Sequence, residues 1–237
     1  MNEKVKYIHE ENFHNFGAAN EIVPFIINLL EPKSVVDVGC GIGTWLKIFK
    51  DKGVIDILGI DGGYVDKRML KINQKNFKEF DLEKFYRSKR KFDLAISLEV
   101  AEHLSPTSAD DFVKTLIGLS NIIIFSAAIP YQGGQNHINE NKPSYWIEKF
   151  EKSGFKLYDV LRPQFWNNEN IDSWYKQNIF LFTNQINLDS KLNTLKSFYG
   201  SYLVHPEIFK YKVIEHRHYK FQYETIMDAL PDENIID

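Results

Sequence analysis

Cysteine, long apolar runs and a secretory-type leader are all missing or scarce in this sequence of 237 residues. The single cysteine, Cys40, excludes an intrachain disulfide and fits a reducing compartment. No run approaches the roughly 18 consecutive apolar residues that a membrane-spanning helix requires. The polar residues that follow Met1 are not typical of a signal peptide. We therefore expect a cytoplasmic protein with no membrane partner.

A strong positive charge is also absent. The 29 Lys and Arg residues are outnumbered by 32 Asp and Glu residues, which gives a formal net charge of −3. Nucleic-acid-binding domains usually carry a basic excess or a basic patch. The densest basic run, residues 87–91, is short and is typical of a solvated helix end. We therefore expect no nucleic-acid partner.

What the chain does have is an alternation of strand-like and helix-like segments. Hydrophobic residues make up 43% of the sequence and charged residues 26%, as in a soluble globular protein. The alternation predicts an α/β fold: a Rossmann-like, doubly wound and mostly parallel seven-stranded sheet. The expected strands are residues 34–38, 55–60, 77–80, 92–98, 121–126, 155–161 and 178–183. The expected helices are residues 22–30, 44–50, 67–74, 83–90, 109–119 and 144–152.

The pattern changes after Asn184. Residues 185–237 keep a helical periodicity but carry no strand signal, and about 50 residues is marginal for a separate core. We therefore predict one domain over residues 1–184 and a helical C-terminal appendage over residues 185–237. The apolar stripe over residues 198–203 is spaced as in a helix, so we expect the appendage to act as a lid or in a homodimer.

A glycine-rich segment follows the first expected strand, with glycines at 39, 41 and 43. Glycine lets the chain turn sharply and brings the backbone against a ligand where a Cβ would collide. The spacing differs from the dinucleotide-binding fingerprint, and the Lys-Ser/Thr of a phosphate-binding loop is missing. A tight strand-to-helix turn remains the simpler alternative.

Acidic residues end the next two expected strands. Asp61 follows the glycines by about 20 residues, which is where nucleotide-binding sheets place an acid that accepts hydrogen bonds from ribose hydroxyls. Asp81 could meet an adenine amino group, with Leu82 facing the ring. The carboxyl ends of parallel strands are where open sheets bind ligands. The glycines and both acids are therefore candidates for one nucleotide site.

Residues 20–184 resemble the class I S-adenosylmethionine-dependent methyltransferases in the order of these motifs. The resemblance implies S-adenosyl-L-methionine as cofactor, with its methionine end over Gly39–Gly43, its ribose on Asp61 and its adenine by Asp81 and Leu82. The residues expected to bind the cofactor are Asp37, Gly39, Cys40, Gly41, Gly43, Thr44, Trp45, Asp61, Gly62, Asp81, Leu82, Leu98 and Glu99.

A second polar set, Glu99, Glu102 and His103, follows the expected strand 92–98. In a helix these residues would share one face, at i, i+3 and i+4. Two neighbouring carboxylates repel each other unless a positive group lies between them, and a divalent metal would supply it. His137 lies in the loop after the neighbouring strand and could be a fourth ligand. Carboxylates with imidazoles suit Mg²⁺, Mn²⁺ or Fe²⁺ better than a structural zinc site.

Three interpretations of this set remain open. A metal held by Glu99, Glu102, His103 and His137 could polarise a substrate hydroxyl. Alternatively, His103 or His137 could be a metal-free general base, with Glu102 as the third candidate catalytic residue. In the third interpretation Glu102 and His103 only cap the next helix while Glu99 touches the cofactor.

The polar set is similar to the metal site of small-RNA 2′-O-methyltransferases, although His137 matches only by its order in the sequence. Its Glu-x-x-Glu-His part also looks like that of quinone-biosynthesis O-methyltransferases. The longer stretch from His137 to Asn178, with its Trp and Tyr residues, resembles bacterial methyltransferases of surface-polysaccharide (capsule) gene clusters. That resemblance implies a small-molecule or nucleotide-sugar-like acceptor with a sugar, nucleotide-linked or phosphoramidate hydroxyl. The alternatives are a quinone or other small-molecule enzyme, an RNA 2′-O-methyltransferase, or a non-catalytic methyltransferase-like interaction protein.

Overall fold

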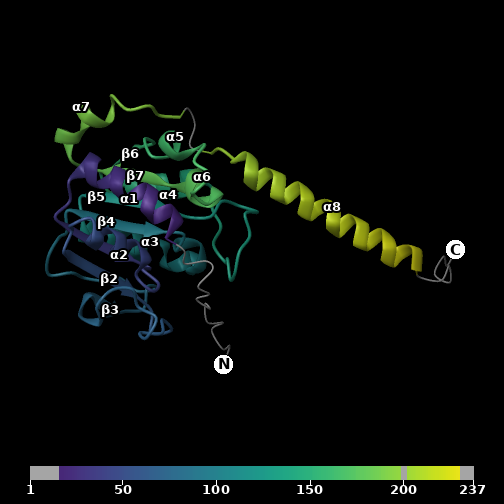
Figure 1. Cartoon of the computed structure of the whole chain (residues 1–237), viewed down its shortest axis with the longest axis horizontal. Helices are drawn as coiled ribbons and strands as arrows, with labels where there is room; N and C mark the ends of the chain where they lie inside the picture. The colour runs from purple at the N-terminus through teal and green to yellow at the C-terminus, as the bar shows by residue number, and fades with distance from the viewer. Residues whose placement is uncertain (1–15, 199–201, 230–237) are drawn as a thin grey trace. The chain divides into compact units, whose positions relative to one another are not determined.

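A seven-stranded sheet lies at the centre of the computed structural model, which describes residues 16–198 and 202–229 (Figure 1). The strand order is β3-β2-β1-β4-β5-β7-β6, and all neighbouring pairs are parallel except those that β7 makes with β5 and β6. This confirms the predicted Rossmann-like, mostly parallel sheet. The strands are β1 (Ser34–Val38), β2 (Asp56–Asp61), β3 (Phe77–Glu79), β4 (Leu94–Leu98), β5 (Ile122–Ser126), β6 (Lys156–Tyr158) and β7 (Phe180–Thr183).

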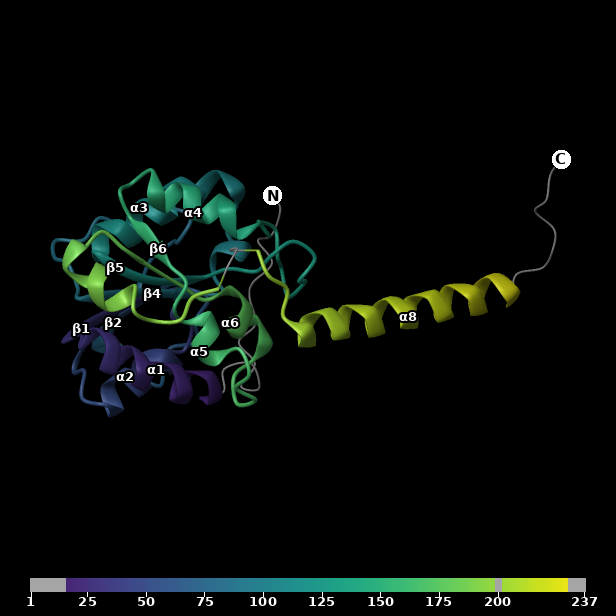
Figure 2. The ribbon, with the colours of Figure 1, turned by 90° about the horizontal axis from the view of Figure 1, so that it is seen from above.

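Helices cover both faces of this sheet, so its central strands are buried on both sides (Figure 2). Val35 of β1 packs in one hydrophobic core together with α1 and α2, whereas Val36 packs in a second core with α3 and α4, because successive strand side chains point to opposite faces. The helices are α1 (Gly17–Leu30), α2 (Thr44–Asp51), α3 (Ala109–Leu119), α4 (Pro143–Glu151), α5 (Arg162–Phe165) and α6 (Ser173–Asn178).

Two of the predicted helices are wrong. Residues 67–74 form turns that lead into the 3-10 turn η2 (Gln74–Asn76), and residues 83–90 contain no helix. The second segment has few apolar residues with which to form a buried helical stripe. The Glu83 carboxylate instead accepts hydrogen bonds from the backbone N–H and the hydroxyl of Ser105. The last two strands exist but are shorter than predicted, and Asn178 belongs to α6 rather than to a strand.

The chain divides into two compact units, residues 1–203 and residues 204–237. The first unit includes η5 (Ile186–Leu188) and α7 (Asp189–Leu192), whereas the second contains the long helix α8 (Pro206–Ala229). The predicted C-terminal helix is therefore present. The stripe over residues 198–203 is not helical at Phe198, Tyr202 and Leu203, and Tyr199 lies outside the described residues. None of the helices in the described ranges is long and apolar enough to cross a membrane.

Candidate active site

The glycine turn (residues 39–43) connects β1 to α2 in a left-handed backbone conformation. Gly39, Gly41 and Gly43 have φ angles of +85°, +52° and +85°. A Cβ at Gly39 would lie 2.3 Å from Cγ2 of Val100, and a Cβ at Gly43 would lie 2.9 Å from Cγ1 of Ile72. Both the backbone conformation and the packing of these two positions therefore require glycine, so the tight-turn explanation accounts for part of the motif.

Asp61 ties the glycine turn to the end of β2. Its side chain is buried, and its Oδ2 accepts a hydrogen bond from the Gly41 N–H at 2.6 Å. Its Oδ1 accepts one from the Gly62 N–H, also at 2.6 Å. These contacts fix a carboxylate at the carboxyl end of β2, next to the turn. The position is the one that a ribose-binding acid occupies in nucleotide-binding sheets.

Asp37, the residue two before Gly39, is a buried carboxylate with an unsatisfied oxygen. Within the described part of the chain, no group donates a hydrogen bond to its Oδ2. Burial raises the pKa of Asp37 well above its usual range, and the neighbouring Asp61 carboxylate raises it further. A buried pair of acids is costly without a compensating positive group. The cationic end of S-adenosylmethionine carries such a group, so these residues fit that cofactor.

The other predicted cofactor residues follow the carboxyl ends of the same strands. Trp45 is partly buried, and its ring meets the Tyr175 ring edge to face, with 5.3 Å between centroids. Leu82 is buried, whereas Asp81 is exposed and pairs with Lys84 at 3.4 Å. Asp81 therefore lies just after the carboxyl end of β3, with its side chain exposed to solvent. The remaining members, Cys40, Thr44 and Leu98, are buried.

Glu99 adopts an unusual backbone conformation directly after β4. Its φ is +54°, a left-handed value that is strained for a residue other than glycine. Its carboxylate accepts hydrogen bonds from Gln132 Nε2 at 3.1 Å and Asn178 Nδ2 at 3.2 Å. Burial raises the pKa of Glu99 to about 7. Only residues 101–103 form a 3-10 turn (η3, Ala101–His103), so the predicted helical face through Glu99 is wrong.

The structure brings together three of the four predicted metal ligands. Ligand atoms of Glu102, His103 and His137, here called the Glu-His cluster, all lie within 4.8 Å of one another. The two imidazole rings meet edge to face, with 4.8 Å between their centroids. Glu102 is fully buried, and its carboxyl group lies beside that of Glu99. Glu99 is not part of this group.

Burial favours the neutral forms of Glu102 and His103 in the absence of a cation. Burial raises the pKa of Glu102 well above its usual range, and the nearby Glu99 adds to the effect. Burial also lowers the pKa of His103 to about 4, with a further contribution from His137. Since a bound cation would compensate the buried carboxylate and leave both imidazoles neutral, this donor set fits a divalent metal.

The loop after β5 holds His137 in the cluster. Nδ1 of His137 lies 2.9 Å from Oε1 of Glu140, and the Glu140 carboxylate also accepts the backbone N–H groups of Tyr131 and Gly133. The N–H groups of residues 138 and 139 both donate to the carbonyl oxygen of Glu102. The loop is therefore hydrogen-bonded to the 3-10 turn that contains Glu102. A carboxylate behind a histidine is a common way to orient a metal-binding or basic imidazole.

Sequence reasoning placed Gln177 and Asn178 in a candidate acceptor segment but did not foresee the amide cluster that they form with Gln132. Nδ2 of Asn178 donates to Oε1 of Gln132 at 2.9 Å, and Nε2 of Gln177 donates to the same oxygen at 3.2 Å. Gln177 and Asn178 are almost fully buried. The available signal was a pair of amide residues immediately before the apolar strand β7. The cluster fixes the Glu99 carboxylate from the side of β7.

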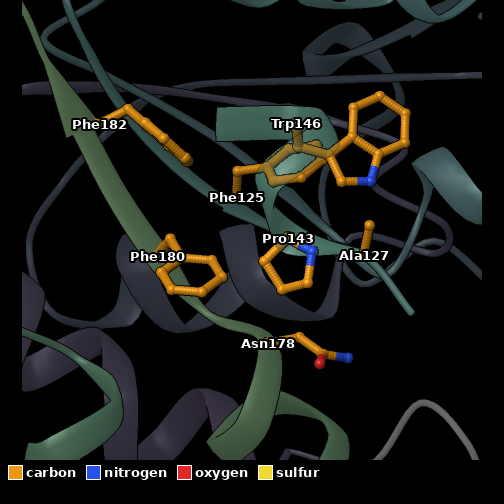
Figure 3. Close-up of a pocket in the computed structure, with 7 residues that line it drawn as sticks. All are labelled: Phe125, Ala127, Pro143, Trp146, Asn178, Phe180 and Phe182. Atoms are coloured by element: carbon orange, nitrogen blue, oxygen red, sulfur yellow. The ribbon is translucent and has the colours of Figure 1, made fainter. Parts of the chain in front are cut away.

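A small apolar cavity adjoins Asn178. Figure 3 shows the aromatic rings around it. The indole N–H of Trp146 is buried and makes no hydrogen bond with any described residue. Trp146 therefore contributes to the core beside the site rather than to an open substrate wall. The lining residues are Phe125, Ala127, Pro143, Trp146, Asn178, Phe180 and Phe182.

One model of a known domain family matches the chain. A methyltransferase-domain family model matches residues 10–117. This range includes the glycine turn, Asp61, Asp81 and the Glu99–His103 segment. No match was found among the curated proteins.

Solved structures show the same fold at low sequence identity. The methyltransferase domain of bacterial CtHen1 is 22% identical, with a TM-score of 0.50, over 69% of this chain and 96% of that one. DesVI of Streptomyces venezuelae is 12% identical, with a TM-score of 0.52, over 76% and 100%. Magnesium protoporphyrin IX methyltransferase of Synechocystis, solved with bound S-adenosylmethionine, is 16% identical, with a TM-score of 0.50, over 74% and 82%. The family model thus describes a methyltransferase domain over residues 10–117, and the solved structures share the fold of the chain.

Proposed function

We propose that this protein is an S-adenosylmethionine-dependent O-methyltransferase that acts on the hydroxyl of a polar small molecule. The observation that carries the proposal is the Glu-His cluster, in which the fully buried Glu102 carboxylate meets two imidazoles. The cluster and the glycine turn both follow the carboxyl ends of central strands. A reacting hydroxyl at the cluster would thus face the donor methyl group.

The Glu-His cluster has the donors that Mg²⁺, Mn²⁺ or Fe²⁺ prefers. Glu102, His103 and His137 would hold the ion, and Glu140 would orient His137. Such an ion supplies Lewis acidity, which lowers the pKa of a coordinated hydroxyl. Glu99 was a fourth predicted ligand, but its carboxylate is bonded to amides, so we assign it to the cofactor or acceptor instead.

In the metal-free alternative, His103 is the candidate general base. Burial lowers the pKa of its imidazole to about 4, so the ring is unprotonated near pH 7 but is a weak base. As the acceptor oxygen bonds to the methyl carbon, the carbon–sulfur bond breaks and the sulfonium charge is lost. The hydroxyl proton leaves to the base, and the products are a methyl ether and S-adenosylhomocysteine. The other main contribution of the protein to catalysis is to hold the acceptor and the cofactor in the orientation for transfer.

The amide cluster supports a hydroxyl-rich acceptor. Carboxamides both donate and accept hydrogen bonds, which matches the hydroxyls of sugars. Gln132 and Asn178 donate hydrogen bonds to Glu99 at 3.1 and 3.2 Å, so carboxamides lie directly beside this carboxylate. Together with the resemblance to capsule-cluster enzymes, this favours a sugar, nucleotide-linked or phosphoramidate hydroxyl of capsule biosynthesis. We place this reaction in the cytoplasm.

A methyl-transfer assay tests the proposal. S-adenosylmethionine with a labelled methyl group is offered with nucleotide sugars, capsule phosphoramidate intermediates, a quinone-type phenol and a short RNA. We expect the label on an oxygen of one of the first two classes. Glu102→Gln should abolish turnover while leaving affinity for S-adenosylhomocysteine unchanged, and the exposed Glu148→Gln is the matched control. Label on carbon or nitrogen, or on RNA alone, would contradict the proposal.

A further inference from the structure

Tyr64 contacts the carboxylate that is proposed to bind the cofactor ribose. Its hydroxyl donates a hydrogen bond to Oδ1 of Asp61 at 2.5 Å. The same oxygen accepts the Gly62 N–H, and the other oxygen, Oδ2, accepts the Gly41 N–H. The three donors are arranged around one buried side chain, and the tyrosine hydroxyl is the only side-chain donor among these three.

Oδ1 of Asp61 already accepts two hydrogen bonds. A carboxylate oxygen offers two lone-pair positions. Gly62 and Tyr64 fill both positions of Oδ1. The vicinal hydroxyls of a ribose are best bound with one hydroxyl on each carboxylate oxygen. Because the Gly62 donor belongs to the backbone at the end of β2, the Tyr64 hydroxyl is the group that can leave.

The surroundings of Tyr64 allow it to move. A Cβ at Gly62 would lie 2.2 Å from Cε1 of Tyr64, so the ring lies directly against this glycine. Tyr64 is nonetheless 44% exposed. Residues 62–73 form no helix or strand, so the ring is carried by a segment of irregular backbone. A rotation of the side chain towards solvent would uncover both Gly62 and Oδ1 of Asp61.

We propose that Tyr64 is a placeholder for the cofactor ribose. Its hydroxyl satisfies the buried Asp61 carboxylate when no cofactor is bound and is displaced when S-adenosylmethionine binds. The inference rests on the proposed ribose contact of Asp61. Since the displaced hydrogen bond is lost on binding, Tyr64 lowers affinity for the cofactor and favours release of S-adenosylhomocysteine after transfer.

The test is calorimetric titration of S-adenosylhomocysteine into Tyr64→Phe, which keeps the ring and removes the competing donor. We expect affinity to rise about two- to tenfold, the range of one net hydrogen bond. Tyr131→Phe, at a residue that is 87% exposed, is the matched control and should leave affinity unchanged. Analogues that lack the 2′- or the 3′-hydroxyl complete the design. For at least one of them the gain should disappear, because the ligand then has no hydroxyl that competes with Tyr64 for Oδ1.

Unchanged or weaker binding by Tyr64→Phe would overturn the placeholder role, and so would an equal gain with both deoxy analogues. Those outcomes leave the proposed function intact as long as the wild-type protein binds S-adenosylhomocysteine. If the wild-type protein does not bind it at all, the cofactor assignment and the placeholder role fail together.

Discussion

The buried Asp37 carboxylate destabilises the protein without cofactor, and we expect it to help bind the cationic end of S-adenosylmethionine. Its folded-state pKa lies above its usual value of 3.8 because of burial and then Asp61. A raised pKa contributes stability at low pH, and this contribution is lost as pH rises above 3.8 through the folded-state value. Asp37 therefore makes the unliganded protein progressively less stable, relative to a neutral side chain, as the solution becomes alkaline.

We predict that Asp37→Asn stabilises the unliganded protein at pH 8 by about 1–3 kcal/mol, with a smaller effect at pH 5. The same variant should bind S-adenosylmethionine more weakly, because the amide cannot neutralise a cation. Urea unfolding at the two pH values and calorimetry measure both effects. A stability difference that does not change with pH would show that Asp37 is not held at a raised pKa.

Asp61→Ala tests the ribose contact. We predict that affinity for S-adenosylhomocysteine falls by about 1–3 kcal/mol, since buried hydroxyls and two backbone N–H groups lose their acceptor. Asp66→Ala, in the same segment but at an ion pair with the exposed Arg68, serves as the control. Equal calorimetric affinities for wild type and Asp61→Ala would rule out the ribose assignment.

Among the elements, the turn from β1 to α2 is the most constrained. Gly39→Ala should destabilise the protein by about 1–2 kcal/mol from its left-handed backbone and by about 1–3 kcal/mol from overpacking against Val100. Gly53→Ala is the matched control, because Gly53 has φ +100° but a Cβ at this position would meet no atom within 4 Å. Urea unfolding of both variants separates the two contributions.

Adding Val100→Ala to Gly39→Ala completes a double-mutant cycle. Removing the two methyl groups that the new Cβ would meet should recover the overpacking part, so the double variant should be more stable than the sum of the single effects. Strict additivity would mean that the glycine is required by backbone conformation alone.

The sheet was predictable because its central strands are short apolar or β-branched segments between clear breaks. Residues 34–38 and 109–119 were predicted with the bounds that the structure shows, since the first is an almost fully buried β-branched segment and the second has one buried helical face. The helices predicted over residues 67–74 and 83–90 were wrong because neither segment buries a continuous apolar face. The short helices α5 and α6 were not predicted, since one or two turns give too little periodicity to recognise.

The cofactor side of the site was more predictable than the acceptor side. Glycines and acids at strand ends follow the geometry of the sheet, so their shared edge could be expected from the sequence. Glu99 was misplaced because its left-handed backbone ends the strand without starting a helix. Gln132 and Asn178 could not be paired in advance, since 46 residues separate them and neither residue type implies a partner.

At the scale of the whole molecule, α8 belongs to a second compact unit and carries exposed aromatic residues. Phe209, Tyr211, Phe221 and Tyr223 are each more than 60% exposed. Exposed apolar residues in such numbers mark interaction surfaces. The two hydrophobic cores contain only residues that precede 204. We therefore propose that α8 contributes to a homodimer or a lid rather than to the stability of the domain.

Truncation after Leu203 tests this role. We predict that the shortened chain keeps its melting temperature and the secondary structure of the domain, because both cores remain. Its mass by light scattering should fall from dimer to monomer, or its turnover should fall if α8 acts as a lid. A truncated chain with unchanged oligomeric state and unchanged turnover would contradict both roles.

The central claim is that an acceptor hydroxyl is methylated at the Glu-His cluster with the help of a divalent metal. The most direct measurement is turnover of the protein after treatment with a chelator, with and without added Mg²⁺ or Mn²⁺, with affinity for S-adenosylhomocysteine measured in parallel. We predict that the chelator abolishes turnover, that the metal restores it, that cofactor affinity barely changes, and that His137→Ala raises the metal concentration required. Full activity in chelator, with His103→Ala still inactive, would contradict the metal and leave His103 as the general base.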